Sequence, residues 1–317
     1  MSSALSGAVH GKFLWFNGKI VPWEEGKIHM SAPKYWSIVD ALRAYPSAIE
    51  PNESYIIRFD DHMKRWYKDL RFYGIPVKYT ADDIRQATIE VTKANDFHGD
   101  VHYILEATMA NSNPPFEAHV AIMPRSNPTH LPPSPTFQAR KAIVSSWRRI
   151  SPDSMPPDVK CWANYGNSAL ATLEAMKQGA DMAIFLDHRG FVSEFTRACL
   201  VAVKHGKIVT PPTYASILDG LTRASLLTFA ADLGLETEER DITRYQLYGM
   251  DEVFAIGSGA EIIPFKEIDG FTIGIGDTGP ITKQVGTYYH DIVSGKVEKY
   301  RSWLLPVYKQ VTPQIKV

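Results

Sequence analysis

The sequence contains little cysteine. Only Cys161 and Cys199 occur among 317 residues, so the chain offers neither a disulfide framework nor the cysteine and histidine spacing of a zinc site. Two isolated thiols are typical of a reducing compartment. We therefore expect a cytoplasmic protein without a metal site.

Long apolar runs and an excess of charge of one sign are missing as well. Apolar stretches such as Met182–Leu186 have the length of a strand, whereas a membrane span needs about 20 residues. The first residues lack the charged start and apolar core of a secretory signal. The formal net charge is −1, with lysine and arginine spread along the chain, which argues against nucleic-acid binding. We expect neither a membrane nor a nucleic acid as a partner.

The sequence does contain enough apolar residues for sizeable cores. Hydrophobic residues make up 44% and charged residues 22% of the chain, which allows one large or two medium domains. A proline-rich segment, residues 124–135, disfavours regular helix and sheet. We therefore predict a small N-terminal α/β domain (residues 1–123), a linker (124–136) and a large C-terminal domain (137–317).

Local patterns predict a mixed α/β fold. Asn17 and Gly18 lie between two short apolar stretches, which indicates a hairpin with a two-residue turn. Helical spacing of apolar residues, with proline and glycine at helix ends, predicts helices at 60–72, 81–94, 167–178, 223–233 and 280–293. Apolar stretches of strand length predict strands at 101–109, 118–123, 141–146, 182–187, 200–204 and 253–256.

The residues that carry chemistry follow one another in four segments. Lys160 lies in residues 158–165, and it is followed by Ser193 and Glu194, by Leu-Asp-Gly-Leu-Thr-Arg at 218–223, and by an acidic and glycine-containing segment at 251–262. A lysine can form a Schiff base with an aldehyde, a carboxylate can keep a pyridine nitrogen protonated, and turn amides with hydroxyls can hold a phosphate. A single lysine is usually a solvated side chain. Together with the other three segments, Lys160 predicts a pyridoxal phosphate site.

The order and spacing of these segments resemble those of the fold-type IV pyridoxal phosphate enzymes, in particular the branched-chain aminotransferases. The likeness runs from about Trp15 to about Trp303. It implies a two-domain α/β fold, with pyridoxal 5′-phosphate bound as a Schiff base to Lys160, which also carries a proton between substrate and cofactor. It implies as well the transfer of an amino group between an amine or amino acid and a keto acid, by a ping-pong mechanism, in a homodimer.

The resemblance assigns cofactor contacts residue by residue. Tyr165 corresponds to a tyrosine that bonds the phenolic oxygen of the cofactor, and Glu194 corresponds to the carboxylate opposite the pyridine nitrogen. We expect a turn just before a helix that starts at Arg223, with two of the phosphate ligands in that turn. The implied phosphate contacts are Arg58, Leu221, Thr222 and Ser258, the last in place of a threonine common in the family.

Both walls of the implied substrate site depart from the family. The strand at 101–108 contains no arginine, where branched-chain enzymes carry one that handles a substrate acid group. The segment at 29–41 is shorter and has Val39 and Asp40 in place of a phenylalanine-glutamate pair, and bulky residues follow Glu194 where the family has small ones. The implied substrate contacts are Tyr35, Trp36, Val39, Ile104, Gly259 and Ala260.

These departures indicate a specificity displaced from ordinary branched-chain L-amino acids, toward amines without a carboxylate, as in the family's R-selective amine transaminases. Alternatively, Arg197 or Arg148 supplies a relocated carboxylate contact, and the chain is a branched-chain or D-amino acid aminotransferase. A lyase of the aminodeoxychorismate type would use the same Lys160 and Glu194. Retention of both residues argues against a non-catalytic binding protein.

One further motif needs a separate interpretation. Gly274, Gly276 and Gly279 match the G-x-G-x-x-G pattern of dinucleotide-binding folds. The segment directly precedes Pro280 and lacks a following βαβ unit with an acidic residue about 20 positions on. We therefore predict a glycine-rich turn before the last helix.

Overall fold

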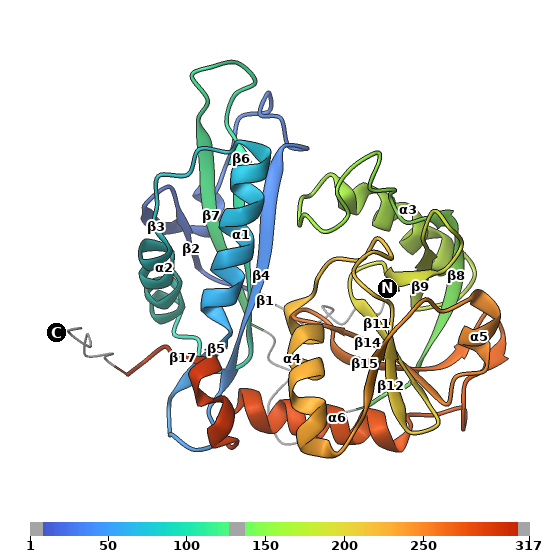
Figure 1. Ribbon diagram of the computed structural model, residues 1–317. Helices are drawn as coiled ribbons and strands as arrows, with labels where there is room; N and C mark the ends of the chain where they lie inside the picture. The colour runs from blue at the N-terminus through green and yellow to red at the C-terminus, as the bar shows by residue number, and fades with distance from the viewer. Residues whose placement is uncertain (1–8, 127–136, 310–317) are drawn as a thin grey trace. The chain divides into compact units, whose positions relative to one another are not determined.

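The computed structural model describes residues 9–126 and 137–309, which form two compact units. The first unit contains residues 9–126 together with 290–309, and the second contains residues 137–289. Each unit is built around its own sheet. Figure 1 labels the helices and strands of both units.

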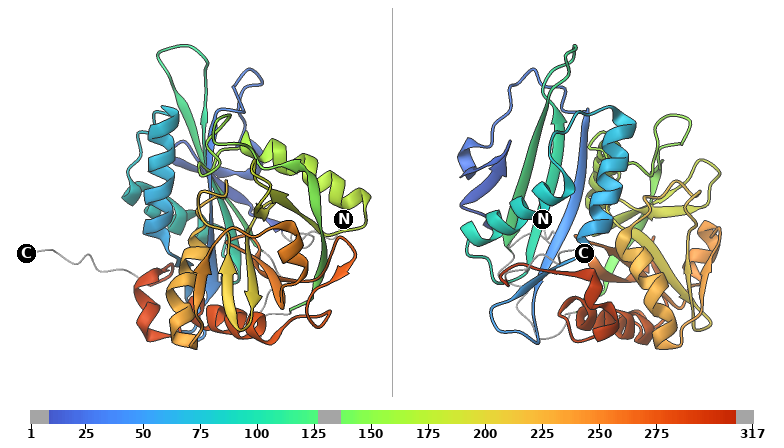
Figure 2. Two further views of the ribbon diagram at one scale, coloured as in Figure 1. Left: turned by 45° about the vertical axis from the view of Figure 1, so that its right-hand side comes forward. Right: turned by 60° about the vertical axis from the view of Figure 1, so that its left-hand side comes forward.

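The sheet of the first unit is antiparallel throughout the described residues. Its strand order is β17-β5-β4-β6-β7-β2-β3, and β1 pairs with β7. Helices α1 and α2 pack against one face of this sheet (Figures 1 and 2). The bounds are β1 Val9–His10, β2 Phe13–Phe16, β3 Lys19–Pro22, η1 Trp23–Glu25, β4 Ser37–Pro46, β5 Ser54–Ile57, α1 Phe59–Tyr73, α2 Ala81–Ala94, β6 Val101–Met109, β7 Ala118–Ser126, η3 Glu298–Trp303 and β17 Leu304–Pro306.

Local signals explain where these elements begin and end. Asn17 (φ 50°) and Gly18 (φ 96°) form the two-residue turn between β2 and β3, so the predicted hairpin is confirmed. At the start of α2, the Thr80 hydroxyl accepts the N–H of Asp83, and the Asp83 carboxylate accepts the N–H of Thr80. Helix α1 ends at Gly74, whose left-handed φ of 64° favours glycine.

Residues 290–309 join the first unit through backbone pairing. Strand β17 pairs with β5, and the buried Glu53 carboxylate accepts the N–H groups of Val307, Tyr308 and Lys309. The sequence prediction counted this segment with the C-terminal domain, and the compact units differ from it because the pairing joins segments distant in sequence. Of the predicted linker, residues 124–126 belong to β7, and residues 127–136 lie outside the described residues.

The sheet of the second unit mixes parallel and antiparallel pairs. Its order is β10-β9-β8-β15-β14-β11-β12-β13, with β16 on β15. Strand β8 runs parallel to both of its neighbours, and β12 runs parallel to β13. The bounds are β8 Arg140–Arg148, α3 Asn164–Lys177, β9 Met182–Leu186, β10 Val192–Phe195, β11 Cys199–Lys204, β12 Lys207–Thr210, α4 Leu221–Phe229, η2 Ala230–Leu233, β13 Thr237–Glu239, α5 Arg244–Tyr248, β14 Glu252–Gly257, β15 Glu261–Ile268, β16 Phe271–Thr272 and α6 Pro280–Val293.

Apolar side chains pack on the sheet of the second unit and hold its strands in place. Ala171 and Ala175 of α3 pack against Ile143 of β8 and Phe185 of β9. A larger core cluster includes Phe195 and Phe265, whose rings stack at a centroid distance of 4.5 Å. This close apolar packing therefore holds in place the polar residues at the ends of the strands.

The structure confirms most predicted elements and corrects several bounds: α3, for example, begins at Asn164, three residues before its predicted start. The predicted helices at 81–94 and 280–293 and the strand at 101–109 have the predicted bounds. The predicted helix at 223–233 is α4 followed by η2, and it ends at Gly234 in the left-handed conformation. Helix α4 begins at Leu221, so the predicted turn at Leu221 and Thr222 is wrong: Gly220 is the N-cap, and both residues are helical. Across the ranges described, no helix is long and apolar enough to cross a membrane.

Candidate active site

Lys160 lies in a loop whose shape is fixed by the start of the next helix. The side-chain amide of buried Asn164 donates to the carbonyls of Pro156 (3.0 Å) and Val159 (2.9 Å). Tyr165 is the second residue of helix α3, and Lys160 Nζ donates to its Oη at 2.6 Å. The sequence prediction placed these two side chains in one site, and the structure brings them together.

Glu194 is buried at the end of β10 beside two polar groups. Only 5% of the residue is exposed. Arg149, which directly follows β8, places its Nε 3.0 Å from Glu194 Oε1, and the backbone N–H of Leu218 donates to the same oxygen at 3.3 Å. A buried carboxylate therefore has an arginine on one side and a loop amide on the other.

The ionisation of Glu194 depends on these neighbours. Burial raises the pKa of the Glu194 carboxyl above its ordinary value, because the charged form loses its hydration. Arg149, the Leu218 amide and Lys160 act in the opposite direction, in that order of strength, without cancelling the effect of burial. Lys160 is thus close enough to Glu194 to affect its charge.

The start of α4 offers a place for an anion. Its N-cap, Gly220, has no side chain to cap the helix, and a Cβ there would lie 2.6 Å from Cys199 Sγ. The first helical residues are Leu221 and the buried Thr222, so two backbone amides and one hydroxyl stand at a helix N-terminus. Arg223 anchors the helix: it is buried and donates to Thr210 Oγ1 at 3.1 Å and to the Pro211 carbonyl at 2.9 Å.

A second turn lies next to Glu194. Gly257 ends β14, and a Cβ on it would lie 3.7 Å from Ala198 Cα, in the tight turn that follows Glu194. Ser258 and Ala260 are partly exposed in the turn between β14 and β15, and Gly259 is exposed. Four predicted segments of the second unit, those of Lys160, Glu194, Leu218 and Ser258, thus lie close together.

The chemistry of this donor set fits pyridoxal phosphate. An amine with an adjacent phenol, a buried carboxylate and a helix N-terminus with a hydroxyl supply what its aldehyde, pyridine nitrogen and phosphate require. Residues 37–268 match the model of the amino-transferase class IV family. The chain belongs to the class IV aminotransferases. It is therefore a fold-type IV enzyme that uses pyridoxal 5′-phosphate.

Similar proteins and structures agree with this assignment. The chain is 35% identical over 305 residues to a probable branched-chain-amino-acid aminotransferase of Aquifex aeolicus, covering 93% of this chain and 97% of that protein. It is 33% identical over 307 residues to the branched-chain-amino-acid aminotransferase of Escherichia coli K12, covering 92% and 96%. The branched-chain amino acid aminotransferase of Thermobaculum terrenum in its PLP form superposes with a TM-score of 0.87 at 35% identity, covering 95% of this chain and 99% of that one.

Arg58 belongs to the first unit, where its backbone and its guanidinium are both held. It is the N-cap of α1 with a left-handed φ of 50°, and its N–H donates to the Trp303 carbonyl at 2.6 Å. The guanidinium pairs with Asp61 at 2.8 Å and lies 5.1 Å from the centre of the Trp303 ring. The phosphate contact predicted for Arg58 stays a prediction, and the structure shows that its side chain is held by Asp61 and the Trp303 ring.

The predicted substrate residues of the first unit separate into two groups. Val39 and Ile104 share the sheet face opposite the helices, because Val39 pairs across from Glu106, and Ala41 pairs across from Ile104. Tyr35 precedes β4 and is 68% exposed, whereas Trp36 donates from its Nε1 to the Tyr73 carbonyl at 2.8 Å. The structure brings Val39 and Ile104 together, and Trp36 is engaged in the fold.

Sequence reasoning missed two buried charge clusters. Arg149 was not singled out, whereas its neighbour Arg148 was, and the structure exposes Arg148. The other cluster surrounds Asp40, which is fully buried, 2.8 Å from both His62 Nδ1 and Arg65 Nη2. The order of residues in the sequence gives no sign of these pairings.

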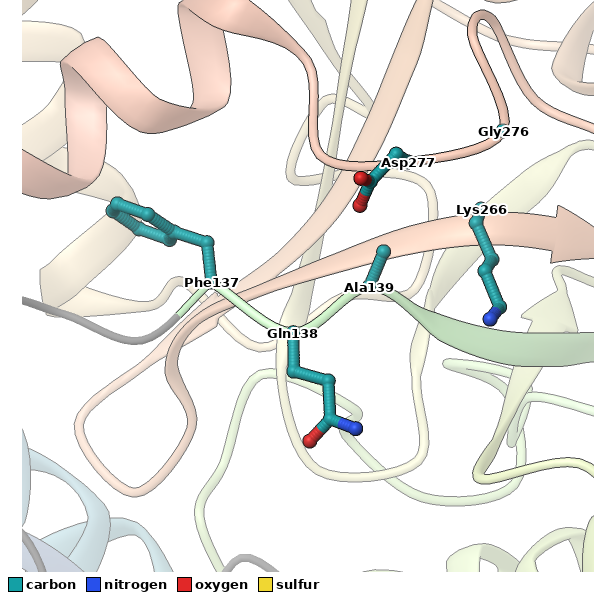
Figure 3. A pocket seen from close by; sticks show the side chains of 6 residues that line it. All are labelled: Phe137, Gln138, Ala139, Lys266, Gly276 and Asp277. Atoms are coloured by element: carbon teal, nitrogen blue, oxygen red, sulfur yellow. The ribbon is translucent and has the colours of Figure 1, made fainter.

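The glycine-rich segment lies at a different place in the second unit. Gly274 and Gly276 have left-handed φ angles of 52° and 71°, between β16 and α6, as a turn before the last helix requires. Gly276 and Asp277 line a pocket of about 460 Å³ with Phe137, Gln138, Ala139 and Lys266 (Figure 3). None of the predicted catalytic or cofactor residues lines it.

Proposed function

We propose that the enzyme transfers the amino group of an amine without a carboxylate, as an R-selective amine transaminase does, to a keto acid. The observation that carries this proposal is the face of β6 opposite the helices. Ile104 and Glu106 lie there, partly exposed, and β6 contains no arginine. Glu106 accepts a hydrogen bond from Thr108 Oγ1 at 2.7 Å, so its carboxylate is held on this face. A donor carboxylate would meet repulsion at this wall, and a plain amine would not.

The catalytic roles follow from the chain's own groups. Bound pyridoxal phosphate supplies a carbonyl that takes up the amino group and a ring that withdraws electrons from the substrate carbon. We assign Lys160 Nζ to hold the cofactor and to move the proton of the donor carbon, and Tyr165 Oη to orient that nitrogen and to bond the phenolic oxygen of the cofactor. Glu194 keeps the proton on the pyridine nitrogen. The proposed phosphate ligands are Arg58, Leu221, Thr222 and Ser258, and the proposed substrate contacts are Tyr35, Trp36, Val39, Ile104, Gly259 and Ala260.

A branched-chain or D-amino acid aminotransferase is the second candidate. Two observations favour it: the named relatives are branched-chain-amino-acid aminotransferases, and Arg197 is exposed at the tip of the turn that follows Glu194. Phe195 N–H donates to the Ala198 carbonyl across this turn at 2.9 Å, which leaves Arg197 on the surface next to the proposed cofactor carboxylate. An arginine there supports carboxylate recognition by a residue outside β6.

We also propose a cytoplasmic homodimer. Leu170, Leu173 and Met176 of α3 are 43%, 54% and 49% exposed and lie three residues apart, so they form an apolar stripe that a second subunit would cover. Cys161 and Cys199 are both buried and neither forms a disulfide within the described ranges, which is typical of a protein in a reducing compartment. Light scattering coupled to size exclusion tests the dimer, and a monomer at micromolar concentration would refute it.

The donor is tested in a half-reaction. The protein is saturated with pyridoxal phosphate, and loss of the cofactor's visible absorption band is followed after adding an R-amine, the matching S-amine, an L-branched-chain amino acid or a D-amino acid. We expect the R-amine to react and Lys160→Ala to be inert with every donor. Conversion by amino acids alone would support the second candidate, and release of product from a donor without an amino acceptor would indicate a lyase.

A further inference from the structure

Arg149 and Glu194 form a buried ion pair that the transamination chemistry does not by itself explain. The two residues are 7% and 5% exposed, and Arg149 Nε lies 3.0 Å from Glu194 Oε1. The backbone N–H of Arg149 donates to the Leu186 carbonyl at 2.9 Å, which ties the arginine to β9. Its guanidinium lies 5.9 Å from the centre of the Phe185 ring. Burying a charge is unfavourable unless it is paired, so this arginine is held at the carboxylate by the fold.

Arg149 carries a fixed positive charge, whereas the nitrogen of Lys160 takes part in the reaction. Burial favours the protonated Glu194 carboxyl, and Arg149 is the strongest of the groups that oppose this effect. Lys160 also opposes it, but its nitrogen is the group that the reaction uses. An arginine stays protonated throughout the working pH range. Arg149 is therefore the permanent cation beside Glu194.

We infer that Arg149 is a positioning residue that keeps Glu194 ionised, so that the proton shared with the cofactor stays on the pyridine nitrogen. The inference rests on the proposed contact between Glu194 and that nitrogen. Without the guanidinium, the proton moves from the nitrogen to the carboxylate: one N–H bond breaks, one O–H bond forms, and the number of protons is unchanged. The ring then carries no positive charge and withdraws electrons less strongly from the substrate carbon.

Of two adjacent arginines, Arg149 pairs with Glu194 and Arg148 does not. Arg148 is exposed, whereas Arg149 is buried, and the register of β8 with β9 shifts between Val144 and Arg148. This irregularity breaks the alternation of the strand just before it ends, and Arg149 follows with its guanidinium at Glu194. Arg148→Met therefore changes the same charge on an exposed neighbour and serves as the matched control.

The first readout uses the protein without cofactor. Infrared difference spectra at neutral pH detect the carbonyl stretch of a protonated carboxyl group. We expect this band in Arg149→Met, its loss in Arg149→Met/Glu194→Gln, and its absence from Arg148→Met and the wild type. Arg149→Gln, which loses the charge but keeps a polar end, replaces Arg149→Met if that variant does not fold. An Arg149 variant that is folded and shows no such band would overturn the inference.

The second readout uses pyridoxal phosphate labelled with ¹⁵N in the ring. We expect the nitrogen shift of a protonated ring in the wild type and in Arg149→Lys, and that of an unprotonated ring in Arg149→Met. The half-reaction should slow in Arg149→Met by the same factor as in Glu194→Gln, with KM unchanged. A wild-type shift in Arg149→Met would also overturn the inference. A wild-type shift in Glu194→Gln would instead refute the proposed pyridine contact, while the cofactor-free spectra still decide the role of the ion pair.

Discussion

Lys160 Nζ and Tyr165 Oη lie 2.6 Å apart, and the short segment between the two residues keeps them at this distance. Tyr165 is the second residue of α3, and Asn164, the first, bonds two carbonyls of the lysine loop. The ring of Trp162 meets the Tyr165 ring edge-on at 5.4 Å, which limits its rotation. The lysine therefore has a hydrogen-bond partner supplied by its own segment of chain.

Removing this partner should reduce turnover without unfolding the protein. Tyr165→Phe removes the hydroxyl that accepts from Lys160 Nζ and that the resemblance pairs with the phenolic oxygen of the cofactor, and a hydrogen bond to a charged group contributes about 1.5–3 kcal/mol. We expect a fall in kcat of about tenfold or more, together with a shifted visible absorption band of the bound cofactor. Steady-state kinetics and absorption spectra check this result. Tyr214→Phe, at a tyrosine that is 63% exposed, is the matched control, and equal kcat values for the two variants would contradict the assigned role.

The Asp40 cluster should make the stability of the protein depend on pH. Burial disfavours the charged carboxyl, but Arg65 and His62 outweigh it and hold the pKa of Asp40 far below its ordinary value of 3.8. Because this pKa is lower in the folded than in the unfolded chain, the carboxylate stabilises the fold above pH 3.8, and the stabilisation is lost as the pH falls below it. Asp40→Asn should therefore cost about 3 kcal/mol at pH 7, since it leaves the largely buried Arg65 guanidinium without its counter-charge.

Urea unfolding at pH 7 and at pH 3 checks this prediction. The difference between wild type and Asp40→Asn should shrink below pH 3.8 by about 1.4 kcal/mol for each pH unit. Asp60→Asn removes one of the two carboxylates that pair with Arg85 at the surface, where Asp60 is 71% exposed, and should change stability by less than about 1 kcal/mol. A difference that is as large at pH 3 as at pH 7 would refute the account.

The structure brings together several segments that the sequence singled out, and each of these segments is contiguous in the chain. Lys160 and Tyr165 are five residues apart, whereas the predicted start of α4 at Arg223 was two residues late, since the helix begins at Leu221. Such sequence patterns relate only residues that lie close together in the chain. Strand β4 was missed because Asp40 and Arg43 interrupt its apolar pattern, and their partners lie 22 to 57 residues away.

Arg149 shows a second limit. Alternation along a regular strand would have indicated which of two adjacent arginines points inward, but the register shift near the end of β8 removes that information. Trp303 shows a third, because it reaches Arg58 only after β17 has paired with β5 at the other end of the sequence. In each case the decisive contact is between residues that no local pattern relates.

Trp303 should strengthen cofactor binding through Arg58. Stacking of a guanidinium on an indole ring contributes about 0.5–2 kcal/mol, so Trp303→Leu should weaken pyridoxal phosphate binding by about two- to thirtyfold. The hydrogen bond from Arg58 N–H to the Trp303 carbonyl remains, because it uses the backbone. Titration of the cofactor-free enzyme measures the change, with Trp147→Leu as the control. If Trp303 acts only through Arg58, Trp303→Leu should not weaken cofactor binding further in a protein that already carries Arg58→Met. Additive losses of affinity would show that the two residues act independently.

The last prediction concerns the wall that carries the proposed specificity. Ile104 lies on the partly exposed face of β6, next to Ala41 on β4 and two residues from Glu106. An arginine at this position would offer a substrate carboxylate a charged hydrogen bond, which contributes about 1.5–3 kcal/mol. Ile104→Arg should therefore raise kcat/KM for L-leucine relative to the corresponding amine by about tenfold or more. Ile104→Met has a similar reach without the charge, and competition assays with paired donors compare the two variants. Because the wild type and the methionine variant both keep the Glu106 carboxylate on a wall without an arginine, both should favour the amine, and an equal preference in all three proteins would place the carboxylate contact outside β6.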